Sequence, residues 1–292
     1  MVMTKKIGAH VSIAGGIDKA VVRAQQLGAN CLQVFSGSPR MWKRTPLEKI
    51  NLDKLFTKQK ELGVSPIFTH ALYLINLASD KPELIKKSAT ALIHDLKFDA
   101  LVKGSGVIVH LGSHQGRGWH TVKNQLVKLI KKVLAATPQA SQLLIENSAG
   151  QKGKVCSDLA EISWLLNQVD DPRLGWCFDT CHAFTAGYRL YAGHKIAVKE
   201  PAQDRGVAIN KIKELKLWPT LKCVHVNDSK FEFGSGRDRH ANLGEGQINK
   251  KAWKSFFAHD QVKSLPLILE VPGFDNQGPD AENLARLKEL AT

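Results

Sequence analysis

The stretch Arg173-Leu-Gly-Trp-Cys-Phe-Asp-Thr-Cys-His182 joins a short apolar run to two possible metal ligands, Asp179 and His182. An apolar strand is readily buried, whereas an ionised carboxylate at its tip must be solvated, paired or bound to a metal. Cys177 and Cys181 lie four residues apart, so a zinc–thiolate site is an alternative at this point. Apolar runs that end in a polar ligand recur along the chain, and this recurrence predicts the fold.

Short apolar runs alternate with amphipathic stretches from one end of the chain to the other. Strands are expected at roughly 5–12, 30–36, 65–70, 106–110, 141–146, 173–179, 221–226 and 265–270. Helices are expected at 16–27, 47–62, 82–101, 121–136, 157–169, 207–215, 251–259 and 280–290. Eight strand–helix units without a break in composition predict a single TIM (β/α)8 barrel over residues 1–292, with the active site at the C-terminal ends of its strands. A doubly wound open sheet is the alternative, but no glycine-rich dinucleotide motif opens the first helix.

Six successive predicted strands each end in an imidazole or a carboxylate. These residues are His70, His110, Glu146, Asp179, His225 and Glu270. The C-terminal ends of barrel strands meet at one mouth, where the active sites of this fold lie. Six such groups around one opening would repel one another or be desolvated without cations between them. The set therefore predicts a multinuclear metal site, and its mixed nitrogen and oxygen ligands suit zinc or manganese better than magnesium.

Two further elements could add ligands to this site. His182 lies one helical turn beyond the sixth predicted strand. In the loop after the seventh strand, the Asp238-x-His240 spacing lets both side chains point the same way from an extended segment. The three residues could hold a third metal, although an exposed charged loop is the alternative for Asp238 and His240. The flanking Arg237 and Arg239 would also suit phosphate contacts.

Charge and cysteine content narrow the classes of function. The chain has 41 Lys and Arg against 27 Asp and Glu, a net charge of +14, which favours a polyanionic partner such as nucleic acid over a merely solvated basic surface. Five scattered cysteines without a Cys-x-x-Cys pair predict buried thiols, not disulfides. No apolar segment approaches the roughly 20 residues needed to span a bilayer. The opening Met-Val-Met-Thr-Lys-Lys is too short and polar for a signal peptide, so a cytoplasmic location is expected.

From residue 7 to residue 270, the chain resembles the endonuclease IV family of apurinic/apyrimidinic (AP) endonucleases, which repair DNA at abasic sites. The matching stretches are 7–12, 70–77, 110–113, 145–151, 179–184, 225–229, 237–240, 243–246 and 269–270. Asp-Thr-Cys-His-Ala is highly specific in combination with Asp-Arg-His followed by Leu-Gly-Glu-Gly. The resemblance implies a TIM barrel that holds three zinc ions.

Carried over position by position, the resemblance assigns nine ligands to the three zinc ions, with manganese as an alternative at some sites. They are, ion by ion, His70, His110 and Glu146; Glu146 again with Asp179, His225 and Glu270; and His182, Asp238 and His240. Glu146 would bridge two of the ions and act in catalysis. In this assignment Cys177 and Cys181 are packing residues.

The resemblance also implies DNA contacts from the loops around the barrel mouth. The residues concerned are Arg40, Tyr73, Leu74, Arg237 and Arg239. In the family, an arginine after the second strand and a Tyr-Leu pair after the third penetrate the bent duplex. Without the resemblance, core packing is the better interpretation of Tyr73 and Leu74. The stretch Arg-Met-Trp-Lys-Arg at 40–44 combines basic residues with an aromatic ring, as phosphate contact and stacking require.

The implied reaction is zinc-dependent phosphodiester hydrolysis 5′ to abasic sites, giving a 3′-hydroxyl and a 5′-deoxyribose phosphate, with trimming of blocked 3′ ends. A monomer acting on double-stranded DNA, without membrane or organic cofactor, is expected. A metal-dependent sugar isomerase on a related barrel is one alternative, disfavoured by the possible third metal and the net charge. A non-catalytic DNA-binding protein with a structural metal is another, disfavoured because structural zinc sites are usually rich in thiolates. The chain departs from the family pattern at 36–39, 71–72 and Leu111, which concerns the DNA-facing loops.

Overall fold

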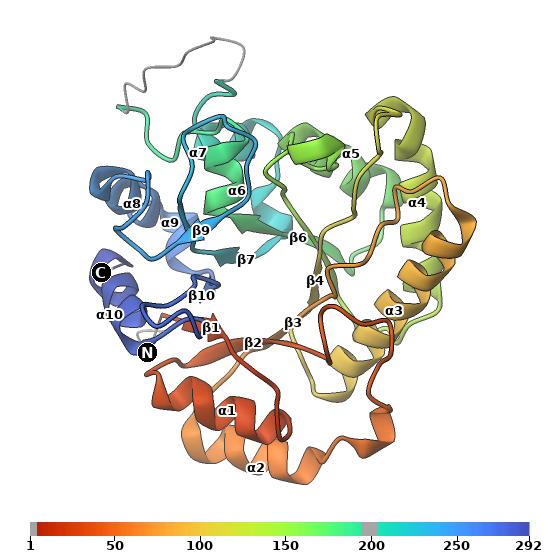
Figure 1. Cartoon of the computed structure of the whole chain (residues 1–292), viewed down its shortest axis with the longest axis vertical. Coiled ribbons are helices and arrows are strands. Elements are labelled where there is room, and N and C mark those ends of the chain that lie inside the picture. The colour runs from red at the N-terminus through yellow and green to blue at the C-terminus, as the bar shows by residue number, and fades with distance from the viewer. Residues whose placement is uncertain (1–4, 194–203, 292) are drawn as a thin grey trace.

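Eight parallel strands close into a barrel in the computed structural model, which describes residues 5–193 and 204–291 (Figure 1). The strands are β1 (Ile7–His10), β2 (Cys31–Phe35), β3 (Ile67–His70), β4 (Val107–Val109), β5 (Leu143–Glu146), β6 (Leu174–Asp179), β7 (Leu221–His225) and β10 (Leu267–Leu269). The ring closes because β1 pairs with both β2 and β10. The TIM barrel and all eight predicted strands are thereby confirmed. The expectation about the amino-terminal segment falls largely on positions outside the described residues.

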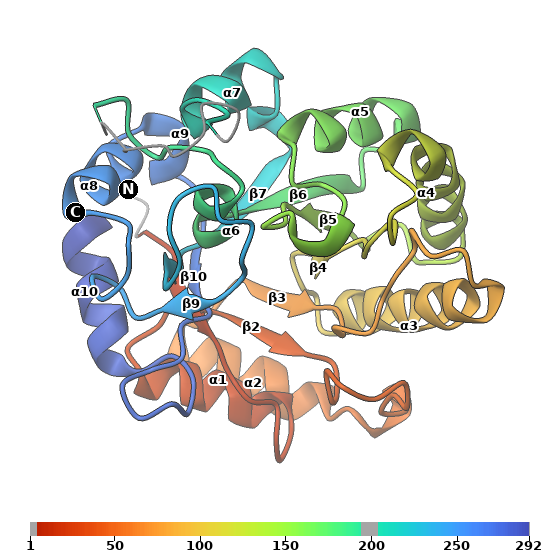
Figure 2. The ribbon, with the colours of Figure 1, turned by 45° about the horizontal axis from the view of Figure 1, so that its top comes forward.

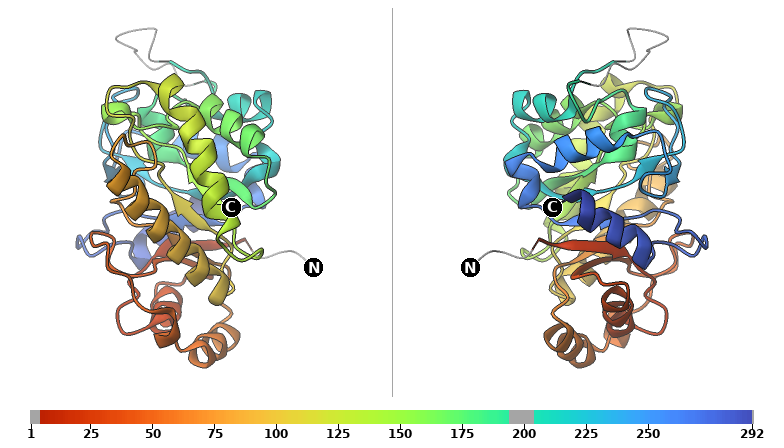
Figure 3. Two further views of the ribbon diagram at one scale, coloured as in Figure 1. Left: turned by 90° about the vertical axis from the view of Figure 1, so that its right-hand side faces the viewer. Right: turned by 90° about the vertical axis from the view of Figure 1, so that its left-hand side faces the viewer.

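Helices surround the barrel on the outside, as the side views also show (Figure 3). They are α1 (Ile17–Gln26), α2 (Leu52–Leu62), α3 (Pro82–Leu101), α4 (Trp119–Ala135), α5 (Leu159–Val169), α6 (Thr180–Thr185), α7 (Ala208–Glu214), α8 (Lys250–Phe257), α9 (Asp260–Lys263) and α10 (Ala281–Ala291). A short antiparallel pair, β8 (Asp228–Ser229) and β9 (His240–Ala241), lies outside the barrel. Within the described ranges, none of the helices has the length and apolar character that crossing a membrane requires.

The second helix is shorter than the sequence pattern predicts. The expected span 47–62 begins with a separate 3-10 turn at Leu47–Lys49, after which the chain is extended. The side chain of Asn51 then accepts a hydrogen bond from the backbone N–H of Lys54 at 3.0 Å, so α2 begins at Leu52. Asparagine is a strong N-cap because its side chain satisfies a free N–H of the first turn. This cap separates two segments that share one apolar periodicity.

The barrel interior explains why the polar residues collect at the mouth. It is filled by six buried apolar side chains, namely Phe68, Ile108, Leu144, Cys177, Cys223 and Ile268. Each lies two positions before one of the six residues that end the strands, and strand residues two apart face the same way. Because these apolar side chains already fill the interior, the polar residues two positions further along each strand lie at its C-terminal opening. All five cysteines are free and buried, which confirms the prediction of buried thiols.

A buried carboxyl group on α3 supports β3 from behind. Asp99 accepts a hydrogen bond from the Thr69 hydroxyl at 2.7 Å, while its other oxygen has no partner within the described ranges. Burial raises the pKa of Asp99 to about 7 from an ordinary value of 3.8. Between these values the native state therefore holds a proton that the unfolded chain has lost. This difference makes the free energy of unfolding fall as the pH rises through that window.

We expect Asp99→Asn, which cannot ionise, to remove this dependence. The difference in free energy of unfolding between the variant and wild type should increase by up to about 4 kcal/mol in favour of the variant between roughly pH 4 and pH 7. One pKa unit corresponds to about 1.4 kcal/mol. Urea unfolding of both proteins at the two pH values measures the change. A difference between variant and wild type that does not vary with pH would contradict the expectation.

Candidate metal centre

Nine acidic and histidine side chains meet at the C-terminal mouth of the barrel. A group of Asp179, Cys181 and His240 has candidate ligand atoms within 4.8 Å of one another, and the nine side chains form three further groups of this kind. These three groups are His70, His110 and Glu146; Glu146, Asp179, His225 and Glu270; and His182, Asp238 and His240. Glu146 belongs to two groups, so one carboxylate links them. The structure thus places together all nine residues that the sequence singles out as ligands.

Glu146 lies between the first two groups and faces four imidazoles. Its Oε2 is 3.3 Å from His70 Nε2 and 3.2 Å from His110 Nε2. Its Oε1 is 3.1 Å from His225 Nδ1 and 3.3 Å from His182 Nδ1. Burial alone would raise the pKa of Glu146, but the surrounding imidazoles outweigh it and hold that pKa well below its usual range. An ionised carboxylate with one oxygen toward each group is suited to bridge two cations.

The third group depends on α6 and on the β8–β9 pair. The Asp179 carboxylate caps α6 by accepting from the backbone N–H of His182 at 2.7 Å, and this first turn brings the His182 ring to the mouth. The loop between β8 and β9 folds back beside α6 (Figure 2). His182 Nε2 lies 3.1 Å from Asp238 Oδ1, and His240 Nε2 lies 3.7 Å from the same oxygen. The extended segment expected for Asp238 and His240 therefore leads into a strand.

Buried ring nitrogens without hydrogen bonds indicate that these groups fit cations. Nε2 of His182 and Nε2 of His240 both face Asp238 Oδ1, are buried and make no hydrogen bond of regular geometry within the described ranges. Buried polar atoms are rarely left unsatisfied in native proteins, and a missing ion is one explanation. Burial lowers the pKa of His110 to about 3, so its imidazole is neutral and has a free lone pair at neutral pH. The mixed donor set fits zinc or manganese.

Two asparagines that the sequence analysis did not single out hold Asp179 in place. Asn147 accepts from the Asp179 backbone N–H at 2.7 Å and donates to its carbonyl at 3.0 Å. Asn227 donates to Asp179 Oδ2 at 2.6 Å and accepts from the Glu270 backbone N–H at 2.8 Å. Each asparagine follows a strand end by one or two residues, which is the sequence signal that could have revealed it.

His10, which ends β1, lies beside the candidate ligands. Its Nδ1 lies 3.3 Å from Glu270 Oε1. The ring also packs against Phe35, with ring centroids 4.3 Å apart. His114 instead accepts backbone hydrogen bonds from Gly116 and Gly118 within its own loop. The structure therefore links only His10 of these two to the candidate ligands.

The cysteines near Asp179 fit packing better than metal binding. Cys177 lies in the apolar barrel interior. The sulfur of Cys181 is close to candidate ligand atoms of Asp179 and His240, but it donates to the Arg239 carbonyl oxygen at 3.8 Å. The zinc–thiolate alternative at these two cysteines is therefore disfavoured.

Comparison with known proteins identifies the family of this chain. A family described as the xylose isomerase-like TIM barrel matches residues 21–290. The chain is 39% identical to probable endonuclease 4 of Halothermothrix orenii, covering 96% of this chain and 99% of the relative. Endonuclease IV from Thermus thermophilus superposes with a TM-score of 0.81 at 33% identity, covering 98% of both chains. The chain belongs to the endonuclease IV family. A D-tagatose 3-epimerase-like protein, at 16% identity and a TM-score of 0.69, shares the fold alone.

The Tyr-Leu pair of this endonuclease IV family member is exposed beside the mouth. Tyr73 is 60% exposed and Leu74 is 36% exposed, whereas the neighbouring Leu72 and Ile75 are buried. Core packing is therefore the wrong interpretation of Tyr73 and Leu74, because the turn after β3 uses the flanking residues for the core. The backbone N–H of Tyr73 donates to a carbonyl of the loop that carries Arg40, at 3.1 Å. The two loops that the family resemblance assigns to DNA are thus joined.

Arg44 is not free to contact phosphate. The prediction that the stretch 40–44 contacts DNA is therefore wrong for Arg44. Its Nη2 lies 3.0 Å from Asp95 Oδ1 and 2.6 Å from Ser36 Oγ. The Arg44 side chain is 7% exposed and that of Asp95 is fully buried. The Arg44–Asp95 ion pair anchors the loop after β2 to α3, while Arg40 in the same loop stays exposed. Trp42 is partly buried and packs against the core, so it is not a free stacking platform.

A cavity of about 330 Å³ opens at the mouth. Its lining residues are His70, Tyr73, His110, His182, Asp238, Arg239, His240, Glu270 and Pro272. Arg237 and Arg239 are exposed near this cavity, and the Arg237 guanidinium lies 3.7 Å from the centre of the Phe231 ring. Exposed guanidinium groups beside candidate cation sites suit the binding of a phosphate backbone.

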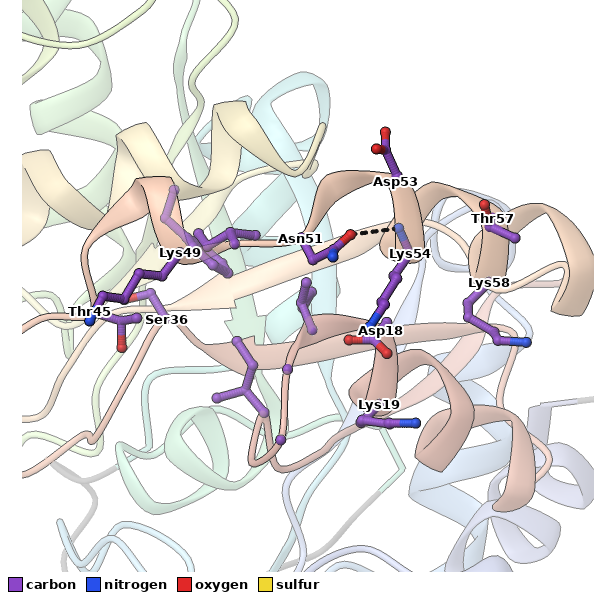
Figure 4. A pocket seen from close by; sticks show the side chains of 16 residues that line it. Asp18, Lys19, Ser36, Thr45, Lys49, Asn51, Asp53, Lys54, Thr57 and Lys58 are labelled. Carbon is purple, nitrogen blue, oxygen red and sulfur yellow. Dashed lines mark hydrogen bonds between the residues drawn. The ribbon is translucent and has the colours of Figure 1, made fainter.

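A larger cavity of about 740 Å³ lies between α1 and α2, away from the nine residues (Figure 4). Four lysines line it, but none of the nine candidate ligands does. Its Asn51 is engaged in capping α2 through Lys54, as the dashed line shows (Figure 4). Six of the nine candidate ligands line the smaller cavity instead, so the smaller cavity is the candidate metal site of this endonuclease IV family member.

Proposed function

We propose that the protein is a zinc-dependent AP endonuclease that cuts double-stranded DNA 5′ to abasic sites and leaves a 3′-hydroxyl and a 5′-deoxyribose phosphate. One observation carries the proposal: three ligand groups share one mouth, and Glu146 belongs to two of them. Membership of the endonuclease IV family supports a repair endonuclease. Trimming of 3′-phosphodiester and 3′-phosphate ends in base excision repair requires the same hydrolysis of a phosphate ester at a 3′ oxygen.

We propose three zinc ions, one for each group of side chains, with manganese as the alternative for the same ligands. Bound zinc supplies Lewis-acid stabilisation of phosphate oxygens and acidifies water. Glu146 would hold the first two sites at a fixed spacing because its two oxygens face different groups. His182 would link these sites to the third, since it approaches both Glu146 and Asp238.

Exposed residues around the mouth would bind and orient the DNA. Arg40, Arg237 and Arg239 are exposed and would contact backbone phosphates. Tyr73 and Leu74 would enter the duplex as an apolar wedge, the way side chains of bending proteins unstack a base step. Extrusion of an abasic nucleotide is easier than flipping a normal base because no pairing partner is lost.

We also propose that residues 1–292 act as one domain and as a monomer. Pairing of β1 with β10 supports one domain, because the first and last barrel strands of the described residues belong to one closed sheet around one core. A single mouth on one face would let one copy engage one duplex. Hydrolysis by water needs no organic cofactor.

The two alternative functions fit the site less well. A sugar isomerase would not need the third group, His182, Asp238 and His240, or the arginines around it. A closed structural metal site is expected to be rich in thiolates, whereas these groups contain imidazoles and carboxylates and line an open cavity. The site therefore favours a metal-dependent nuclease.

A nicking assay on a duplex with one abasic analogue tests the proposal. We expect a single cut 5′ to the lesion that is lost with a chelator and restored by zinc, in a protein that holds about three zinc ions per chain. Salt-dependent binding without cleavage under any metal would favour the non-catalytic alternative. Two magnesium or manganese ions together with sugar isomerisation would favour the isomerase.

Tyr73→Ala should weaken nicking more than it weakens the fold. Stacking on an aromatic ring contributes about 1–3 kcal/mol per base, so we expect kcat/KM to fall roughly 10- to 100-fold. Tyr73 is 60% exposed but its ring contacts Phe35 and His70 edge-on, so the free energy of unfolding of the protein should fall by no more than about 1.5 kcal/mol. Steady-state nicking and urea unfolding measure the two effects. Tyr73→Phe keeps the ring and should retain activity, whereas equal losses in both variants would argue against stacking.

A further inference from the structure

Gln33 is a buried carboxamide beneath the candidate ligands. It lies in the middle of β2, in register with His10 of β1 and Phe68 of β3, and it is fully buried. The interior cluster around this depth is apolar. A carboxamide placed there costs free energy unless its hydrogen bonds are made, so its partners show what it does.

The Gln33 side chain makes three short hydrogen bonds to the mouth. Its Oε1 accepts from His225 Nε2 at 2.7 Å. Its Nε2 donates to Glu270 Oε1 at 2.6 Å and to His10 Nδ1 at 2.8 Å. An amide oxygen only accepts and an amide nitrogen only donates. The opposite orientation would press the amide oxygen against the Glu270 carboxylate, so these roles follow from the chemistry.

This contact determines which nitrogen of His225 can bind a cation. Because Gln33 Oε1 can only accept, His225 Nε2 must carry a hydrogen, and only Nδ1 can present a lone pair. His225 Nδ1 lies 3.1 Å from Glu146 Oε1, 3.2 Å from Glu270 Oε2 and 4.0 Å from Asp179 Oδ2. That nitrogen is therefore the one that faces the other members of its ligand group.

Glu270 is oriented by the same carboxamide. Its Oε1 accepts from Gln33, while its Oε2 lies beside His225 Nδ1. Gln33 is uncharged, so it holds this carboxylate without neutralising it. His10 completes the arrangement by accepting the second amide hydrogen at Nδ1.

We propose that Gln33 is a positioning residue of the metal centre, which fixes His225 in the tautomer that binds through Nδ1 and turns Glu270 Oε2 toward the same ion. The inference rests on the proposed function, because it requires a cation in the group of Glu146, Asp179, His225 and Glu270. Residues that orient metal ligands typically contribute a factor of 10 to 100 in metal affinity.

Gln33→Met tests the proposal, since methionine has a similar length but no hydrogen-bonding amide. In zinc-loaded protein mixed with excess chromophoric chelator, about one zinc ion should leave roughly 10- to 100-fold faster than in wild type. Ile108→Val is the matched control, because it alters the same barrel interior without removing a hydrogen-bonding group. It should lower the melting temperature and leave the release of zinc unchanged. In nitrogen-15 spectra of zinc-loaded wild type, His225 should carry its proton on Nε2.

The outcomes separate this inference from the proposed function. Wild-type rates of zinc release in Gln33→Met, with a lower melting temperature, would show that Gln33 only packs, and would overturn this inference alone. A wild-type protein that holds no zinc would overturn both proposals. If Gln33→Met does not fold, the wild-type spectrum decides, because a His225 protonated at Nδ1 excludes the proposed role.

Discussion

Glu146→Gln should reduce nicking of an abasic duplex by roughly 10³-fold or more, while the barrel stays folded. The carboxylate presents one oxygen to His70 and His110 and the other to His225 and His182. A carboxamide has one acceptor oxygen, and its NH₂ group must face one of the two sets. It cannot bridge two cations and carries no charge to offset theirs. Size and shape are preserved, so the loss should lie in the chemistry.

The measurement is single-turnover nicking together with metal content and circular dichroism. Glu161→Gln is a matched control, because Glu161 Oε2 accepts from the Cys156 backbone N–H at 2.6 Å, outside the nine residues of the mouth. This control should nick at the wild-type rate. Nicking by Glu146→Gln within about tenfold of wild type would remove the basis for a bridging carboxylate.

Asp228→Ala should lower the free energy of unfolding by about 3–5 kcal/mol. Each buried group left without a hydrogen bond costs about 1–3 kcal/mol, and structural relaxation and entering water offset part of this cost. The fully buried carboxylate accepts four backbone hydrogen bonds. Its Oδ2 accepts from Gly244 at 3.0 Å and Gly246 at 3.2 Å. Its Oδ1 accepts from Ser229 at 2.8 Å and Ile248 at 3.0 Å. A side chain at Gly246 would collide with this carboxylate, so the loop that contains Gly246 packs closely around Asp228.

The same substitution should loosen the third ligand group. Asp228 pairs with Ala241 and Ser229 with His240 in the β8–β9 pair, so loss of the anchor frees the strand that begins at His240. Urea unfolding and metal content measure the two effects. Glu282→Ala, which removes a carboxylate 58% exposed and 2.8 Å from Arg286, should cost less than about 0.5 kcal/mol. A loss below about 1 kcal/mol in Asp228→Ala would show that water replaces the carboxylate.

The sequence by itself determined the barrel and the residues at its mouth. Apolar residues such as Phe68 and Leu144 precede His70 and Glu146 by two positions, and the period of two in a strand places each pair on one face. Parallel strands of a closed barrel end at one mouth, so local patterns sufficed to predict which side chains meet. The family motifs supplied the division into three groups.

Tertiary structure alone decided which other polar residues serve that mouth. Gln33 reads as one residue of an apolar strand, and its partner His225 lies 192 positions away. Arg44 reads as a DNA contact, but it pairs with Asp95, 51 positions away. Without the family resemblance, the local pattern predicts a core position for Tyr73, and the turn after β3 exposes it. Periodicity reports which face of its own element a residue occupies, whereas hydrogen bonds and burial depend on which distant element packs against that face.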